Sequence, residues 1–131
     1  MKCLEKVKDI LKKYDFTLPL PEGVKTVYEF EEKPDWLKSK KRDGYFMDKY
    51  DKHIPQGWYG FALGSPTPKV WLDALDEVLA LLILHDPAFE IHQIKTKFGG
   101  VRFYVESELI EDIWDIESLI EDTMFDKALI Y

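Results

Sequence analysis

A chain of 131 residues is long enough for one domain with its own core, and 46% hydrophobic and 15% aromatic residues exclude a disordered chain. The longest apolar run, residues 78–84, is far shorter than the about 20 residues that span a membrane, so we expect no membrane segment. The N-terminal residues are charged and contain no apolar export signal, and Cys3 is the only cysteine, so we expect a cytoplasmic protein without a disulfide.

The N-terminal part of the chain is predicted to contain two helices and one strand. Residues 2–14 carry apolar side chains at helical spacing, which predicts an amphipathic helix. Residues 24–31 alternate between the two sides of an extended chain and predict a strand. Residues 33–53 are charged and mixed, and we expect a short helix and irregular chain there. The expected anchors are Leu4, Val7, Leu11 and Tyr14 in the first helix, and Trp36, Leu37, Tyr45, Phe46 and Tyr50 in the last segment.

A loop rich in glycine and proline follows. Residues 54–68 contain three glycines and three prolines, which is typical of an ordered loop. An additional strand is conceivable near residues 58–63. The aromatic side chains of this segment, Trp58, Tyr59 and Phe61, are predicted to pin it to the core.

A long helix is predicted over residues 68–85. Thr67 supplies a capping hydroxyl, Pro68 suits the first helical position, and the Asp-Pro pair at residues 86–87 ends the helix. Beyond Glu77 the helix is apolar all round, which indicates that it is covered on every side. Either the N-terminal helix or a second subunit could provide this cover, so a monomer and a homodimer both remain open. The expected inner residues are Trp71, Leu75, Val78 and Leu82, and the outer residues are Asp73, Asp76 and Glu77.

The clearest local signal is a hairpin over residues 90–106. Gly99 and Gly100 lie between two runs of alternating side chains, and adjacent glycines suit a two-residue turn. With these glycines as the loop, Thr96 pairs with Phe103. The face predicted to lie against the core carries His92, Ile94, Thr96, Phe98, Val101, Phe103 and Val105, and the other face carries Ile91, Gln93, Lys95, Lys97, Arg102, Tyr104 and Glu106.

The second face of this hairpin is a small basic and aromatic patch in an otherwise acidic chain. Arg102 offers a planar fork of donors, two lysines add charge, and Tyr104 adds a flat ring, so the patch could bind a small anion or a nucleotide. The commoner interpretation is the outside of a sheet, with lysine stems lying over the tyrosine ring. The candidate binding residues of this patch are Gln93, Lys95, Lys97, Arg102 and Tyr104.

The segment of residues 93–105, Gln-Ile-Lys-Thr-Lys-Phe-Gly-Gly-Val-Arg-Phe-Tyr-Val, resembles the hairpin motif of a family of small uncharacterised phage and prophage proteins. In that family a Gly-Trp-Tyr segment and a Leu-Asp-rich helix precede the hairpin, and an acidic helix follows it. Residues 57–59, 71–79 and 110–121 are similar to these parts, so the resemblance covers residues 57–121. Members often end in a Cys-x-x-Cys tail, which is not found here, so no metal role of that tail is carried over. The family has no assigned activity, and the resemblance implies a mobile-element origin rather than a reaction.

Negative charge is concentrated in the last part of the chain. Residues 106–131 contain nine acidic residues and one lysine. A helix predicted over residues 108–125 places many of these acids opposite an apolar stripe, which favours a solvated face over a catalytic pair. The same face could recognise a protein partner with a basic surface. Its candidate binding residues are Glu108, Glu111, Asp115, Asp122 and Asp126, and the opposite stripe is Leu109, Ile113, Ile116, Ile120 and Met124.

The sequence contains no residue set typical of an enzyme or a metal site. His53, His85 and His92 lack partners at zinc spacing, and His92 is expected to be a core histidine. Cys3 has no obvious base. We therefore expect no catalytic residues, no metal and no cofactor. The lysine-rich cluster at residues 38–42 is diluted by acidic neighbours, so nucleic acid is not the expected partner.

Taken together, these patterns favour a single α+β domain over residues 1–131, with a small antiparallel sheet covered on one face by helices. The leading hypothesis is a non-enzymatic, phage-type interaction protein that binds a macromolecular partner, for example as an inhibitor of a host defence or toxin protein. The rival hypothesis is a small-anion or nucleotide-binding protein, or an enzyme, that uses the basic and aromatic face of the hairpin.

Overall fold

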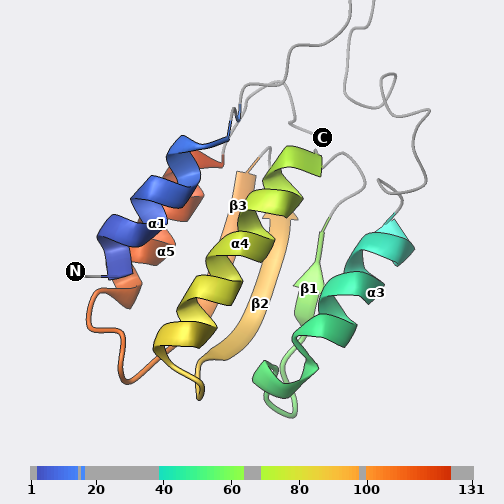
Figure 1. Ribbon diagram of the computed structural model, residues 1–131. Coiled ribbons are helices and arrows are strands. Elements are labelled where there is room, and N and C mark those ends of the chain that lie inside the picture. Colours follow the sequence, from blue (N-terminus) through green and yellow to red (C-terminus); the bar gives the residue numbers. More distant parts are fainter. Residues whose placement is uncertain (1–2, 15, 17–38, 64–68, 98–99, 125–131) are drawn as a thin grey trace, which may run out of the picture.

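The computed structural model describes residues 3–14, 16, 39–63, 69–97 and 100–124. Within these residues the chain forms four α-helices and three strands (Figure 1), and the predicted α+β class is confirmed. The helices are α1 (Cys3–Lys12), α3 (Ser39–Lys49), α4 (Lys69–His85) and α5 (Ile113–Thr123), with a short 3-10 turn η2 (Asp51–His53) after α3. The strands are β1 (Gly60–Ala62), β2 (Glu90–Lys97) and β3 (Gly100–Glu106). The strand predicted at residues 24–31 lies outside the described residues.

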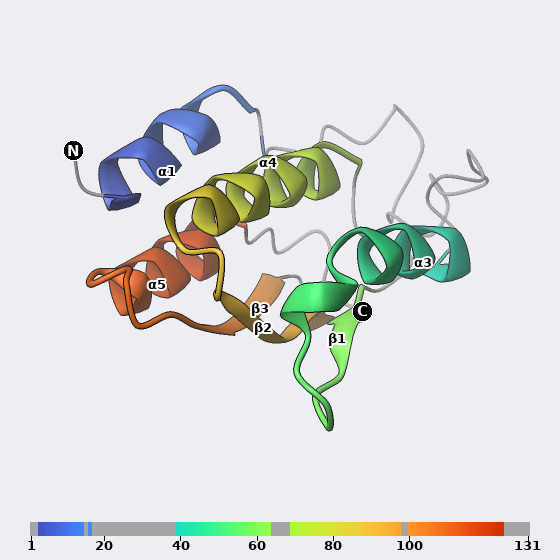
Figure 2. The same cartoon turned by 60° about the horizontal axis from the view of Figure 1, so that its bottom comes forward.

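The sheet forms one layer, and α1, α3 and α4 lie above it on one side (Figure 2). The central helix is α4, and its predicted inner residues are all buried, which confirms the helical stripe. α1 packs against α4 and α5, so it covers part of the apolar surface of α4. Leu79 is fully buried, but Leu84 in the last turn is 79% exposed, so α4 is not covered on every side as predicted.

Two acidic residues of α4, both predicted to lie on the outer side of this helix, hold the neighbouring helices. Glu77 accepts a hydrogen bond from the Tyr14 hydroxyl at 2.5 Å and one from Lys13, at the end of α1. Asp76 likewise accepts hydrogen bonds from side chains of α3 and from the residue that follows this helix. The side chains that donate hydrogen bonds to Asp76 are Tyr45, Lys49 and Tyr50.

The strands are ordered β1-β2-β3, and the sheet is mixed. β2 and β3 are antiparallel, whereas β1 and β2 are parallel. The prediction of an antiparallel sheet is therefore wrong for the first pair. The reason is the connection: α4 carries the chain back along the sheet, so β2 begins at the same end as β1, as in other strand-helix-strand crossovers.

The register of the hairpin differs from the predicted register by two residues. Thr96 pairs with Val101 rather than Phe103, and Gly100 is the first residue of β3, where it pairs with Lys97. Because side chains alternate with a period of two, a slip of two residues leaves most side chains on their predicted face. Ile94 and Phe103 are paired and fully buried, as expected for the core side.

The segment before β1 is less firmly attached to the core than predicted. Phe61 is buried and stacks on Phe46 of α3, with the ring centroids 4.9 Å apart. Trp58 and Tyr59 are instead 49% and 70% exposed. Gly60 takes a φ of +71°, which L side chains rarely adopt, so the backbone here favours glycine; a Cβ would also lie 2.6 Å from the sulfur of Met47, whose side chain would have to shift.

The helices of the described residues include none that is both long and apolar enough to cross a membrane. The Thr67 cap and Asp126 lie outside the described part of the chain.

Candidate functional site

The predicted basic and aromatic residues of the hairpin share one face of the sheet. Lys95 pairs with Arg102 and Gln93 with Tyr104, so these side chains lie on the face away from the helices (Figure 2). Tyr104 is 45% exposed, and Lys97 is exposed at the end of β2. We call these five residues the hairpin face.

The positive charge of Arg102 on the hairpin face is partly neutralised by α5. Arg102 Nη1 lies 3.7 Å from Glu121 Oε1, and Glu121 also accepts the backbone N–H of Phe103 at 3.1 Å. The carboxylate therefore competes with any anion for this guanidinium.

Two glutamate side chains of α5 and the backbone carbonyl of Met124, just after α5, close the edge of the sheet at β3. Val105 donates its backbone N–H to Glu117 Oε1 at 3.3 Å, and Val101 donates to the carbonyl oxygen of Met124 at 3.1 Å, with Glu121 between them. Every second residue of a strand points its N–H toward the same side, and residues four apart on a helix lie on the same face. The N–H groups of the strand edge therefore have about the same spacing as the acceptors on the helix. The arrangement blocks an edge that could otherwise pair with another chain. No role was predicted from the sequence for Glu117 or Glu121.

The predicted acidic helix begins later than expected. α5 starts at Ile113, so Glu108 and Glu111 lie in the loop after β3 and not on a helical stripe. The Ser107 hydroxyl donates to the buried carboxylate of Asp86 at 2.6 Å and accepts the backbone N–H three residues later at 3.1 Å. Such local hydrogen bonds compete with helix formation. The four described candidate residues of this region are exposed: Glu108, Glu111, Asp115 and Asp122.

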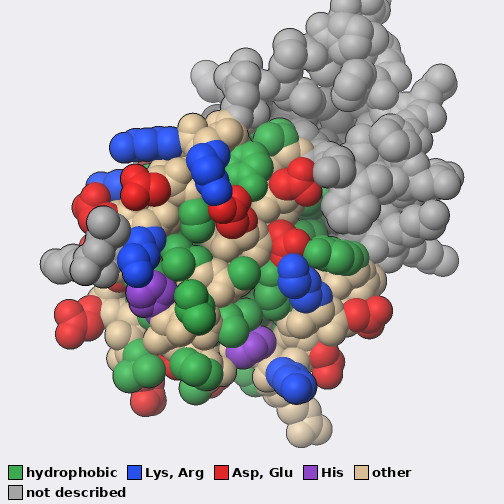
Figure 3. Space-filling model, in the orientation of Figure 1, with side chains coloured by type: hydrophobic (Ala, Val, Ile, Leu, Met, Phe, Trp, Pro, Cys, Tyr) green, Lys and Arg blue, Asp and Glu red, His purple; other side chains and the backbone are tan. Residues whose placement is uncertain are grey.

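Exposed apolar side chains lie among these acidic residues. Leu109 is 67% and Trp114 is 79% exposed, although side chains of this size are usually buried at least in part. We call these two residues, with Glu108, Glu111 and Asp115, the acidic loop surface. Figure 3 shows hydrophobic and acidic side chains next to each other at the lower left of the molecule, where this loop lies in Figure 1.

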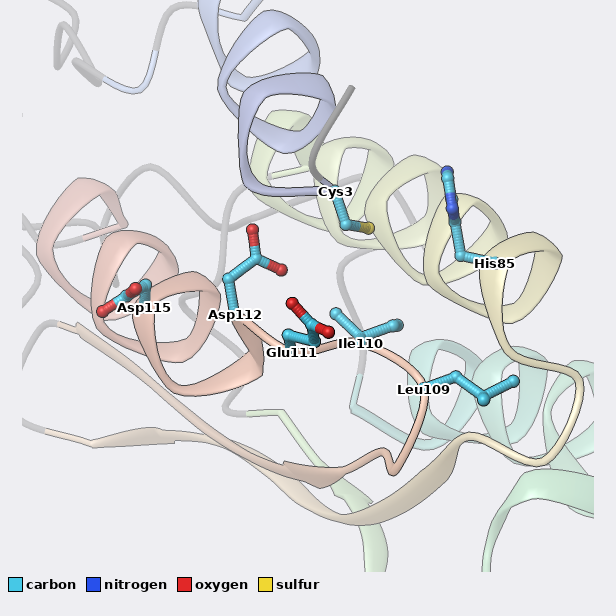
Figure 4. A pocket seen from close by; sticks show the side chains of 7 residues that line it. All are labelled: Cys3, His85, Leu109, Ile110, Glu111, Asp112 and Asp115. Atoms are coloured by element: carbon cyan, nitrogen blue, oxygen red, sulfur yellow. The ribbon is translucent and has the colours of Figure 1, made fainter.

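Two of the hollows beside the acidic loop surface are lined in part by Glu111. The larger, of about 470 Å³, lies between the start of α1, the end of α4 and the loop (Figure 4). The side chains of Glu111 and Asp112 point from the loop toward α1, and Asp112 accepts the backbone N–H of Leu4 at 3.0 Å. The smaller, of about 320 Å³, is lined by Glu108, Glu111 and Trp114 among others. The residues that line the larger hollow are Cys3, His85, Leu109, Ile110, Glu111, Asp112 and Asp115.

Cys3, at the larger hollow, is not activated as a nucleophile. Burial of the thiol and the nearby Asp112 raise the pKa of Cys3, and Lys6 opposes them without reversing the shift. A thiol with a raised pKa stays protonated at neutral pH and reacts slowly. Lys6 Nζ also lies 3.3 Å from Nε2 of His85, the histidine nearest this hollow.

A β-bulge changes the direction of His92. The register shifts between Ile91 and Gln93, so Ile91 turns into the core opposite Val105 and His92 is the extra residue. Ile91 is fully buried, whereas the side chain of His92 is 17% exposed. The prediction that His92 lies on the core face and Ile91 on the outer face is therefore wrong.

His92 lies between two carboxylates and under an aromatic ring. His92 Nε2 is 3.2 Å from Glu90 Oε1 and 3.5 Å from Glu106 Oε2. The ring stacks on Trp58, with centroids 4.2 Å apart and 1° between the planes. In the described part of the chain, these three residues are the one group of potential metal ligands whose donor atoms lie within 4.8 Å of one another. The group was not predicted from the sequence, because without the bulge His92 and Glu106 were assigned to opposite faces of the hairpin.

Comparison with known proteins finds no match for this chain among protein-family models, curated proteins or solved structures. The resemblance of the hairpin motif to small phage proteins stays a prediction.

Proposed function

We propose that this chain is a non-enzymatic interaction protein that binds a protein partner through the acidic loop surface. The observation that carries the proposal is the exposure of Leu109 and Trp114 in the same short segment, residues 108–115, as three exposed carboxylates. Tryptophan is among the residues that contribute most to binding at protein interfaces when it enters a pocket of the partner.

The charges of the surface define the kind of partner. Trp114 lines one hollow with Glu108 and Glu111, and Leu109 lines another with Glu111 and Asp115, so the matching surface has apolar groups flanked by lysine or arginine. Complementary charge accelerates encounter, and the apolar contact slows dissociation. The hollows beside Trp114 and Glu111 give a partner's side chains room to enter.

The resemblance to small phage proteins gives the proposal a biological setting. A phage-encoded interaction protein would meet a host protein, and occupying the functional surface of that protein would inhibit it. This part of the proposal depends on the hairpin motif and not on the acidic loop surface.

A second candidate function is anion or nucleotide binding at the hairpin face. It is favoured by the pairing of Lys95 with Arg102 beside the exposed ring of Tyr104. It is opposed by the contact of Arg102 with Glu121, which neutralises part of the charge.

Retention of partners on immobilised variants tests the two candidates together. We expect the wild-type chain to retain a host protein through the acidic loop surface. Trp114→Ala and the double variant Glu111→Gln, Asp115→Asn should not retain this protein. The same protein is retained by Lys95→Ala and by Tyr59→Ala, a control in which another largely exposed aromatic ring is removed. Loss from Lys95→Ala with retention by Trp114→Ala would instead favour the hairpin face.

A further inference from the structure

The geometry points to a binding site for a divalent transition-metal ion at Glu90, His92 and Glu106. The site lies at one end of the open sheet face and does not depend on the proposed function. Glu90 and Glu106 are paired across the hairpin, and His92 is the extra residue of the bulge beside them.

The distances between donor atoms suit one shared ion. His92 Nε2 lies 3.2 Å from the carboxylate oxygen of Glu90 and 3.5 Å from that of Glu106. Ligand atoms at about 2.1 Å from the same ion are about 3.0–3.4 Å apart at octahedral or tetrahedral angles. The donor atoms of Glu90 and Glu106 lie within 4.8 Å of each other, and the Glu106 side chain, which is 66% exposed, has room to move toward a shared ion.

The pairing of two glutamates is unfavourable without a cation. Glu90 and Glu106 are direct cross-strand partners, and like charges in that position repel each other. Glu117 adds a third carboxylate close enough to His92 for the two to interact electrostatically. One divalent ion offsets this repulsion more completely than a single imidazole does.

The imidazole is held in place by the segment before β1. Trp58 stacks flat on the ring, and the backbone N–H of Tyr59 donates to the carbonyl oxygen of His92 at 3.2 Å. The ring plane and the backbone of the bulge are therefore fixed, with Nε2 directed at both carboxylates. Orientation of a histidine ligand by its surroundings is a usual feature of metal sites.

The chemistry of the donors selects the class of ion. One imidazole nitrogen and two carboxylate oxygens suit Zn²⁺, Mn²⁺ or Fe²⁺ better than Ca²⁺ or Mg²⁺, which prefer oxygen alone. Three protein ligands leave at least one coordination position for water or for a group of another molecule. A hollow of about 350 Å³, lined by both glutamates, Ser107 and Glu108, provides room for it.

Titration of the metal-stripped full-length chain with Co²⁺ tests the site, because Co²⁺ bound by imidazole and carboxylate absorbs visible light. We expect saturation at one equivalent and displacement by Zn²⁺. Glu106→Gln and His92→Gln should each weaken binding by about tenfold or more, since each removes a ligand. Thermal melting of each variant establishes that it is folded.

Two matched controls separate this site from surface binding. Asp51→Asn removes an exposed carboxylate outside this hollow, and His85→Gln removes a histidine from the hollow of about 470 Å³ beside α1. Both should bind Co²⁺ as the wild type does. A wild-type chain without saturable binding, or equal binding by wild type and Glu106→Gln, would overturn the assignment.

Paramagnetic Mn²⁺ locates the ion independently of affinity. Broadening of NMR signals should be strongest for the Trp58 indole and the amides of residues 90–93 and 104–106. Broadening centred on Glu111 and Asp115 would contradict the site.

Discussion

Val105 donates its backbone N–H to the side chain of Glu117, 12 residues later, and this contact ties β3 to α5 where a further strand could otherwise add. Glu121 and the carbonyl of Met124 continue the contact along the strand. Part of the acidic character of the last segment is thus structural, because these two glutamates satisfy the backbone of an edge strand.

Removing the carboxylate of Glu117 should destabilise the fold. Glu117→Ala leaves the N–H of Val105 without its acceptor, at a cost of about 1–3 kcal/mol. Glu117→Gln keeps a carbonyl oxygen in place and should cost less. Urea unfolding of the two variants measures the difference, and equal stability of Glu117→Ala and wild type would show that α5 does not protect the edge through this residue.

Glu117 should also make the stability of the protein depend on pH. Burial raises the pKa of Glu117 above its usual 4.5; the N–H of Val105 opposes this, and nearby Glu121 adds to it. An acid whose pKa is raised in the folded state stabilises that state below its unfolded pKa, and the contribution is lost as pH rises through the folded pKa. In Glu117→Gln the fall in unfolding free energy just above pH 4.5 should be smaller than in wild type.

Asp76 should have the opposite effect on the pH dependence. Burial acts to raise the pKa of Asp76, but hydrogen bonds from Lys49, Tyr50 and Tyr45 outweigh it, and the pKa lies below its usual 3.8. The contribution of Asp76 is therefore present above pH 3.8 and lost as pH falls through the lower folded value. Asp76→Asn should lower the free energy of unfolding by about 1–3 kcal/mol at neutral pH. As pH falls, the free energy of unfolding of this variant should decrease less steeply than that of wild type. If the free energy of unfolding of Asp76→Asn decreased in acid as steeply as that of wild type, the stabilising role of these hydrogen bonds would be contradicted.

The two faces of the hairpin should differ sharply in their response to substitution. Phe103 is fully buried, so Phe103→Asp places an unpaired charge in the core and should cost several kcal/mol or prevent folding. Lys95 lies on the open face, and Lys95→Ala should change stability by less than about 0.5 kcal/mol. Thermal melting of both variants checks the assignment, which fails if the two effects are similar.

The sequence was sufficient to predict features that depend on periodicity. The helical stripe of α4, from Trp71 to Leu82, is buried as predicted. The faces of Ile94 and Phe103 were predicted correctly although the register was not, because a slip of two residues preserves alternation. The residues that form the turn could not be predicted from Gly99 and Gly100, since either glycine is compatible with a position in the turn or at the end of a strand.

Features that depend on contacts between distant residues could not be predicted. The bulge at His92 depends on how β2 meets β3, and the ring of Trp58 reaches it from a different segment. Glu117 and Glu121 have no sequence signal that distinguishes an edge-closing glutamate from a solvated one. The exposure of Trp114 depends on the residue at which α5 begins, and the hydrogen bonds of Ser107 favour a later start of this helix.

Charge on the acidic loop surface should affect the rate of association more than the stability of the fold. Glu111→Gln combined with Asp115→Asn should leave the melting temperature nearly unchanged, because both residues are exposed. Association with the partner should be slower, and the difference from wild type should shrink as salt is raised. The double variant Asp48→Asn, Asp51→Asn removes two exposed acids elsewhere and serves as the control. Equal slowing in both double variants would indicate an effect of net charge alone.

The affinity of Trp114→Ala for the partner retained by the wild-type chain is the most direct test of the proposed function. Trp114 is 79% exposed, so its removal should not alter the fold, and circular dichroism can establish this. If the ring enters a pocket of the partner, the dissociation constant measured by calorimetry should rise by roughly thirtyfold, or about 2 kcal/mol. Tyr59→Ala should bind as the wild type does. A dissociation constant for Trp114→Ala equal to that of wild type would contradict the account.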